Sequence, residues 1–147
     1  MTDVEPDADS WALFDAFRRR ELAAARWTHE AHVRVAWCYL RRFGLEESER
    51  RFPDDLRRHN ESIDKPRGYH ETITLAMLRV LAARLVGPAA AASWSRFAAA
   101  NPELLRWDEP VLLRHYTRER LFSDDARARF LAPDRLPLPT PDEPAVQ

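Results

Sequence analysis

Two short segments of the sequence carry histidines beside other residues that can bind ligands. In the first, His29 and His32 are three positions apart, so on a helix they project from one face and can hold a metal ion between them. In the second, His70 stands between Tyr69 and Glu71. Three imidazoles that leave one coordination position open are typical of a catalytic metal site. The pattern therefore predicts a metal site formed by His29, His32 and His70.

The predicted site favours a metal-dependent enzyme that acts on a small molecule, with the reaction class left open. Imidazole and carboxylate ligands suit zinc, nickel, iron or manganese, and the spacing does not choose among these divalent transition metals. Carboxylates beside such a site can act as general acid or base, and a phenol can orient the substrate. The candidate catalytic residues are Glu71, Glu30 and Tyr69. The candidate substrate-binding residues are Trp27, Tyr116 and His59.

A structural role for the histidines is the main alternative. A histidine near a helix start commonly bonds a backbone carbonyl, and a single His-x-x-His pair is a weak signal. The chain is then a non-catalytic helical module that binds a small molecule or a partner. Metal-free acid–base chemistry by His70 and Glu71 lies between the two hypotheses. An anionic substrate could be bound by Arg118, Arg120 and Arg127, although surface arginines are more commonly only solvated.

The helices that must position these residues can be read from composition and pattern. Ala, Leu, Arg and Glu dominate and no alternating strand pattern occurs, so the predicted fold class is all-α. Ser10 and Thr28 are expected N-caps, Gly44 is expected to end a helix, and Ser123 is expected to cap the last one. The predicted helices cover residues 10–25, 29–43, 45–59 and 68–86, followed by shorter ones at 89–100, 109–116 and 124–130, with a polar loop at 60–67.

Short connections make neighbouring helices antiparallel. The helices that start near residues 29 and 69 then begin at one end of the bundle, where the helix over 45–59 ends. That end collects four of the five histidines, namely His29, His32, His59 and His70. The convergence requires that Pro53 does not break the helix over 45–59.

Length and composition limit the remaining possibilities. A chain of 147 residues is the size of one domain, here predicted as a disordered N-terminus (1–9), a helical domain (10–131) and a Pro-rich extended tail (132–147). The net charge of −1 argues against nucleic acid and membrane surfaces as partners. Cys38 is the only cysteine and no signal-peptide pattern opens the sequence, so a cytoplasmic protein is expected. The expected partner is a small-molecule substrate, and a homodimer is left open.

The segments Trp27–His32 and Gly68–Thr74 resemble a family of short, mostly uncharacterised bacterial helical proteins that share W-T-H-x-A-H and G-Y-H-E-T-x-T motifs. The stretch Tyr116–Pro139 is also similar to the C-terminal pattern of that family. The resemblance implies no particular reaction. It implies that the histidine segments and the Pro-Leu-Pro end belong to one architecture, in which the tail packs against the body.

Overall fold

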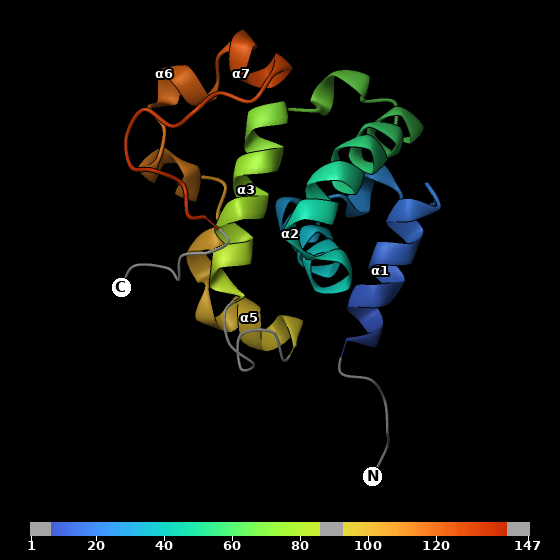
Figure 1. The fold of residues 1–147 in the computed structure, drawn as a ribbon. Helices are drawn as coiled ribbons and strands as arrows, with labels where there is room; N and C mark the ends of the chain where they lie inside the picture. The colour runs from blue at the N-terminus through green and yellow to red at the C-terminus, as the bar shows by residue number, and fades with distance from the viewer. Residues whose placement is uncertain (1–6, 86–92, 141–147) are drawn as a thin grey trace.

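The computed structural model describes residues 7–85 and 93–140, and the regular structure within these ranges is helical (Figure 1). The longer helices are α1 (Ala8–Arg18), α2 (His29–Ser62) and α3 (Glu71–Arg84). Shorter helices and 3-10 turns fill the rest: η1 (Ala24–Arg26), η2 (Pro66–Gly68), α5 (Trp94–Ala100), η3 (Pro102–Leu105), η4 (Val111–Arg114), α6 (Arg118–Leu121) and α7 (Asp124–Ala128). The prediction of an all-α fold is confirmed.

Helix α2 consists of two antiparallel arms, residues 29–43 and 45–62, which meet at Gly44. The backbone there has φ of +78°, a left-handed conformation that glycine adopts at little steric cost. Across the arms Tyr39 donates a hydrogen bond of 2.5 Å to Asp55, and the rings of His32 and Phe52 lie 5.8 Å apart. The arms correspond to the second and third predicted helices, and the break at Gly44 is confirmed.

Pro53 lies inside the second arm of α2 without ending it. A proline has no N–H, so the carbonyl four residues earlier loses its helical hydrogen bond. The side chains of Phe52, Pro53 and Leu56 are buried, and their packing offsets that loss. The arm continues to Ser62, so the segment predicted as a loop from residue 60 begins as helix.

Helix α3 lies beside α2 and runs antiparallel to its second arm (Figure 1). Arg57 and Glu71 form an ion pair of 3.3 Å near one end, and Arg79 reaches Glu49 at 3.2 Å further along. Because the two arms of α2 are antiparallel to each other, its first arm starts at the same end of the molecule as α3. This is the arrangement that the predicted convergence of histidines requires.

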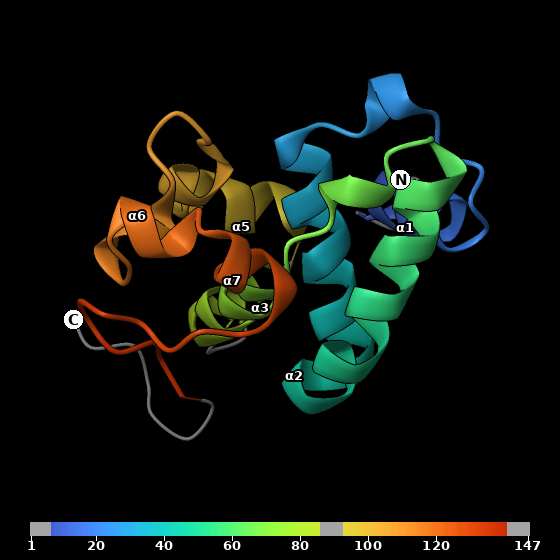
Figure 2. The same cartoon turned by 90° about the horizontal axis from the view of Figure 1, so that it is seen from above.

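The C-terminal segments pack along α3, with α6 and α7 near its start and α5 near its other end (Figures 1 and 2). Thr72 Oγ1 donates to the carbonyl of Arg129 at 2.8 Å and accepts from the N–H of Leu131 at 3.0 Å. Residues 132–140 contain no helix and are held to the body. Arg135 N donates to the His115 carbonyl at 2.9 Å, and Leu138 packs against the core.

The first helix differs from the prediction at both ends. The first helix covers Ala8–Arg18 rather than 10–25, because Arg20 adopts a φ of +60° that no α-helix accommodates. Ser10 is not the N-cap; it is buried and accepts a hydrogen bond of 2.7 Å from Arg34 Nε. Asp7 is 5% exposed and bonds the Trp94 N–H, so the ordered body begins before residue 10.

Two later elements also differ from the prediction, and one predicted cap is confirmed. Helix α3 covers Glu71–Arg84 with His70 as its N-cap, whereas the predicted helix covers residues 68–86; residue 86 and the start of the predicted helix 89–100 lie outside the described residues. The helix predicted over 109–116 is only the short turn η4. Ser123 caps α7 as predicted, accepting from the Ala126 N–H at 3.1 Å.

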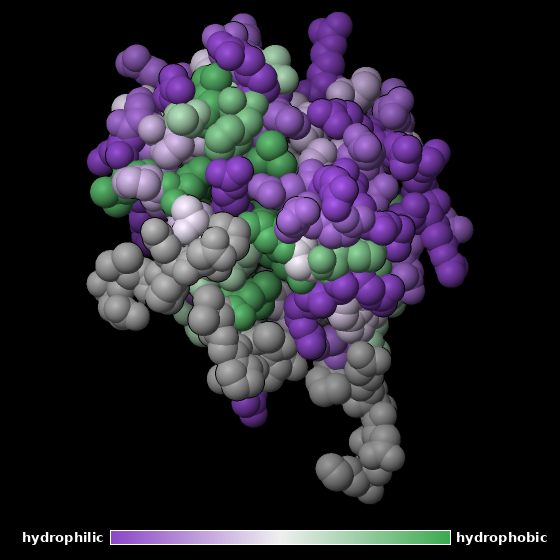
Figure 3. All heavy atoms as spheres, viewed as in Figure 1, coloured by the Kyte–Doolittle hydropathy of each residue, from purple (hydrophilic) through white to green (hydrophobic). Residues whose placement is uncertain are grey.

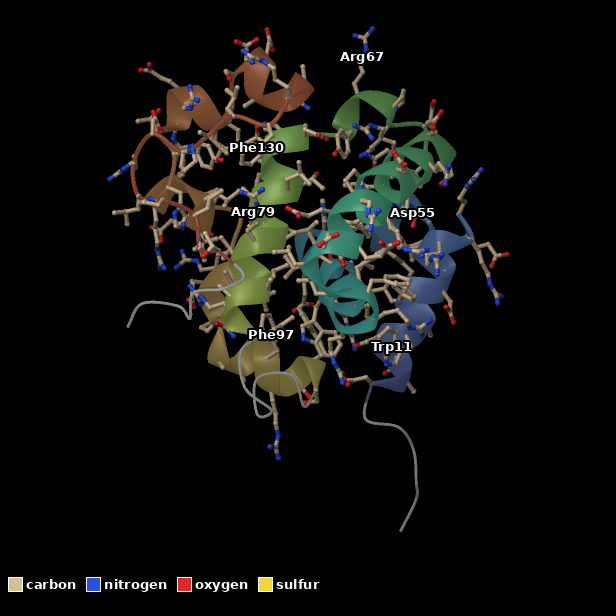
Figure 4. All side chains as sticks on the ribbon, in the orientation of Figure 1. Trp11, Asp55, Arg67, Arg79, Phe97 and Phe130 are labelled. Carbon is tan, nitrogen blue, oxygen red and sulfur yellow. The ribbon has the colours of Figure 1, made fainter. Side chains whose placement is uncertain are left out.

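Aromatic side chains fill the core between α1 and the arms of α2. The ring of Tyr39 lies 5.0 Å from each of Phe14 and Phe52, and Phe17 stacks on Trp27 at 5.1 Å. In Figure 4, Asp55 lies on the side of α2 that faces α1. This aromatic packing fixes the position of Trp27, which contacts the core on one side and the candidate site on the other.

Polar and apolar side chains are distributed unevenly on the face shown in Figure 3. Hydrophilic residues cover the side formed by α1 and α2, and hydrophobic residues gather around α3 and the C-terminal segments. Over the described ranges, no helix combines the length and the apolar character needed to cross a membrane.

Candidate ligand-binding site

A cavity of about 640 Å³ lies between the arms of α2, the start of α3 and the C-terminal segments. This volume is in the usual range for sites that bind small organic molecules. Aliphatic and aromatic side chains from all these elements form its apolar wall: Trp27, Val33, Ala36, Phe52, Leu56, Ile73, Met77, Leu81, Trp107 and Phe122. The polar residues of the wall are Thr28, His29, His32, Asn60, Lys65, His70, Thr74 and Arg127.

His70 lines the cavity, but both of its ring nitrogens are bonded to the backbone. Nδ1 accepts from the Ile73 N–H at 3.1 Å, which makes His70 the N-cap of α3. Nε2 lies 2.8 Å from the carbonyl of Leu121, so it must carry the hydrogen and donate. The ring therefore connects α3 to the end of α6 and has no lone pair free for a ligand.

The start of α2 is capped differently. Thr28 Oγ1 accepts from the Ala31 N–H at 3.1 Å, so neither His29 nor His32 serves as a cap. His29 Nε2 lies 3.0 Å from the Leu104 carbonyl and donates to it, so Nδ1 is an acceptor, and it has no partner among the described residues. No described residue is hydrogen-bonded to the His32 ring, which stacks on Trp27 with 5.0 Å between centroids.

His59 lies behind this wall rather than in it. Its side chain is fully buried, and neither ring nitrogen has a hydrogen-bond partner among the described residues. The ring packs 4.5 Å from Trp27 and 5.0 Å from Phe17. The structure thus brings His29, His32 and His70 to one cavity and leaves His59 beside it, separated by aromatic packing. His115 lies elsewhere, with Nδ1 donating to the carbonyls of Leu136 and Pro137 at 3.1 Å.

Burial keeps the histidines of this end neutral. Desolvation, together with the smaller effects of positive charge on His29 and His59, lowers the pKa of His32 to about 4. Burial also lowers the pKa of His29, against the opposing effect of its bond to Leu104, and that of His59. At neutral pH the free nitrogens of His29 and His32 are therefore hydrogen-bonding groups without charge.

The predicted catalytic residues do not reach the cavity wall. Glu30 is exposed. Glu71 accepts a hydrogen bond from Tyr69 and pairs with Arg57, whose guanidinium carbon lies 4.2 Å from the Tyr69 ring centroid. Arg57 is exposed and none of the three lines the cavity, and burial and the Glu71 bond raise the pKa of Tyr69.

Two predicted substrate-binding residues also lie away from the cavity. Tyr116 is fully buried, and its hydroxyl donates to the Leu131 carbonyl at 2.7 Å. His59 is separated from the cavity as described above. Trp27 alone of the three predicted substrate-binding residues lines it.

The residues available for a metal ion are fewer than the sequence indicated. Because His70 donates and accepts backbone hydrogen bonds, a metal ion could bind it only if one of those bonds broke. Within the described ranges, no three or more His, Cys, Asp or Glu side chains are grouped so that they could hold a metal ion. His29 and His32 remain as a pair of neutral imidazoles in the wall of the cavity.

Several residues of the cavity were not among the predicted site residues. Asn60 and Lys65 fell in a segment predicted as loop, and the one available signal was their position at the converging end of the bundle. Trp107 and Phe122, which are 43% and 41% exposed, pair at 6.4 Å between ring centroids. They reach the site through chain segments without strong periodicity, so no sequence pattern indicated them.

Comparisons with known proteins give no further guide to this site: no protein-family model, no curated protein and no solved structure matches the chain.

Proposed function

We propose that this protein binds a small, largely apolar organic molecule in the cavity between α2, α3 and the C-terminal segments. The observation that carries the proposal is the cavity itself, about 640 Å³ in volume and walled by aliphatic and aromatic side chains with a few polar groups. Sites of this kind bind ligands mainly through apolar contact, and the few polar groups fix the orientation of the ligand.

The histidines of the first arm of α2 supply polar recognition. His32 presents an uncharged ring with one donor and one acceptor nitrogen, and His29 presents Nδ1 as an acceptor. The Trp27 ring, stacked on His32, restricts the orientation of that imidazole. A hydrogen bond between the ligand and His32 would therefore make binding specific, and no charge would have to be desolvated.

The metal-dependent enzyme remains a prediction from the sequence. Its test is zinc or nickel titration of the purified protein by calorimetry, in parallel with His32→Ala. Stoichiometric binding that is lost in the variant would favour a His29–His32 metal pair in the cavity. The geometry supports the binding proposal more strongly, because it requires no rearrangement of His70.

A cavity-filling substitution tests the proposal. Ala36 is 3% exposed and its side chain lines the cavity, so Ala36→Leu adds apolar volume inside an existing space. The probe is 4-phenylbutan-1-ol, followed by amide chemical shifts on titration. We expect saturable shifts at residues of the cavity wall in the native protein and an affinity about tenfold or more lower in Ala36→Leu, a change of at least about 1.4 kcal/mol.

The matched control is Ala12→Leu, the same substitution at an exposed position of α1 away from the cavity. It should bind the probe as the native protein does. Saturable binding that is equal in all three proteins, or shifts confined to another surface, would contradict the proposal. Thermal unfolding of each variant establishes that it is folded.

A further inference from the structure

Within the described parts of the chain, the cavity wall contains cations and no carboxylate. Among the described residues that line it, the formally charged side chains are Lys65 and Arg127, and none is Asp or Glu. Glu61 and Asp64 lie near Lys65 in the sequence, but both are exposed and outside the wall. A cavity with this lining favours a ligand that is neutral or negatively charged.

A buried amide lies at the same end of the cavity. Asn60 is 5% exposed, lines the cavity, and has no side-chain hydrogen-bond partner among the described residues. Because Asn60 lines the cavity, a ligand acceptor placed there could accept a hydrogen bond from Nδ2. A Cβ at position 68 would lie 3.5 Å from Asn60 Nδ2. Because residue 68 is glycine, that side of the amide remains open.

The turn after α2 places Lys65 next to Asn60. Asp64 has a φ of +61°, which reverses the chain at the end of the helix. The N–H of Lys65 then donates to the carbonyl of Asn60 at 2.7 Å, and the N–H of Gly68 donates to the carbonyl of Lys65 at 3.0 Å. The amide of Asn60 and the stem of Lys65 therefore lie within one short turn.

Arg127 reaches this turn from α7. Its Nη1 lies 3.1 Å from the carbonyl of Arg67 and 3.4 Å from that of Tyr69. In Figure 4, by contrast, the Arg67 side chain points outward, away from the body. The backbone bonds hold one edge of the Arg127 guanidinium, and its other donors remain for a ligand. Two cations and the amide of Asn60 thus lie in or beside one turn in the wall of the cavity.

We propose that the ligand is a carboxylate with an apolar body, whose head group is bound by Asn60, Lys65 and Arg127. The inference rests on the proposed function and specifies the ligand class of the same cavity. The apolar body would fill the space between α2 and α3, while the carboxylate would accept from Asn60 Nδ2 and pair with the two exposed cations. One buried donor and two cations suit a single negative charge better than a dianion, which would need more donors.

The test compares ligands that differ only in the head group: 4-phenylbutanoate, 4-phenylbutanamide and 4-phenylbutan-1-ol, titrated into the full chain and followed by amide chemical shifts. We expect the carboxylate to bind about tenfold tighter than the amide, because hydrogen bonds to a charged group are stronger than those between neutral groups. Added salt should weaken binding of the carboxylate and leave binding of the alcohol unchanged.

Variants locate the head group. Asn60→Leu, Lys65→Met and Arg127→Met should each reduce the preference for the carboxylate over the amide by about threefold to tenfold. Arg129→Met is the matched control, because Arg129 is an exposed arginine at the end of the same helix and does not line the cavity. Asn60→Leu removes no hydrogen bond between described residues, so it should also stay folded.

The outcomes separate this inference from the proposed function. Equal affinity for all three ligands would overturn the inference that the ligand is a carboxylate and would leave the proposed function in place. A preference for the carboxylate that all three variants retain would overturn the assigned residues. Failure of all three ligands to bind would contradict both proposals.

Discussion

The starts of α2 and α3 are similar in sequence and differ in what their histidines do. Each start has an aromatic residue with a histidine one or two positions later, and both starts lie at the same end of the molecule. At α2, Thr28 caps the helix, and the His32 ring has no hydrogen-bond partner among the described residues. At α3, His70 is itself the cap, and its second nitrogen bonds Leu121 from another segment.

The difference shows that the residue at the N-cap decides whether a nearby histidine can bind a ligand. A threonine hydroxyl satisfies the first turn of α2 and leaves the imidazoles of His29 and His32 to the cavity. Where the histidine is itself the cap, as at His70, both ring nitrogens form hydrogen bonds to the backbone and neither is available to a ligand. Substitutions at the two helix starts should therefore differ, with the larger loss of stability at α3 and the loss of ligand binding at α2.

The largest expected effect on stability is at His70. His70→Ala removes a cap, leaves the Leu121 carbonyl without its donor and opens space beside the cavity. We expect the free energy of unfolding to fall by about 3 kcal/mol, measured by urea denaturation. His70→Asn can still cap and should lose about half as much. A loss below about 1 kcal/mol for His70→Ala would contradict the structural assignment.

The next expected effect is a pH dependence from the α2 histidines. Burial lowers the pKa of His32 to about 4 in the folded protein, while the unfolded chain titrates near about 6.5. The unfolded state then binds more protons between these values, so stability is full above about 6.5 and is lost as the pH falls toward 4. The slope is at most about 1.4 kcal/mol per pH unit for this group.

His32→Leu isolates that contribution. Urea denaturation from pH 7 to pH 4.5 should show a weaker decline of stability in the variant than in the native protein. Parallel declines would mean that His32 is not desolvated in the folded state.

A smaller effect is expected at the cap of α2. Thr28→Ala leaves the Ala31 N–H without its acceptor, so we expect a loss of about 1 kcal/mol in the free energy of unfolding. Thr28→Ser keeps a hydroxyl and should recover most of it. If Thr28→Ala were as destabilising as His70→Ala, the two helix starts would not differ as we describe.

The smallest expected effect is at His59, whose two ring nitrogens are buried without partners. His59→Leu removes these polar atoms and keeps an apolar side chain against Trp27 and Phe17. We expect the free energy of unfolding to stay unchanged or to rise by up to about 1 kcal/mol, because a buried unbonded polar group is destabilising. A loss above about 2 kcal/mol by thermal or urea denaturation would show that the ring has a partner in solution.

The sequence predicted those features whose causes are local. Thr28 and Ser123 are caps because their hydroxyls bond N–H groups three residues ahead, and Gly44 breaks α2 because glycine tolerates positive φ. The antiparallel order of the helices followed from the short connections. The predicted boundary at residue 25 failed because Arg20 adopts a positive φ, which no side-chain pattern signals.

The candidate site was predictable only in part, because its details depend on distant contacts. The convergence of His29, His32 and His70 followed from helix order alone. The structural role of the His70 ring depends on its hydrogen bond to the Leu121 carbonyl, which is 51 residues away in the sequence. The burial of Asn60 depends on the second arm of α2 extending past the predicted end, and Arg127 reaches the site through backbone carbonyls of a turn 58 to 60 residues earlier.

The most direct test of the account is a long-range proton–nitrogen spectrum of the histidine rings, recorded with and without saturating 4-phenylbutan-1-ol. We expect His70 to show the neutral tautomer with hydrogen on Nε2 in both states, and the ring signals of His32 to move as the ligand saturates. Hydrogen on Nδ1 of His70, or His32 signals that stay unchanged at saturation, would contradict the assignment of one histidine to structure and the other to the ligand.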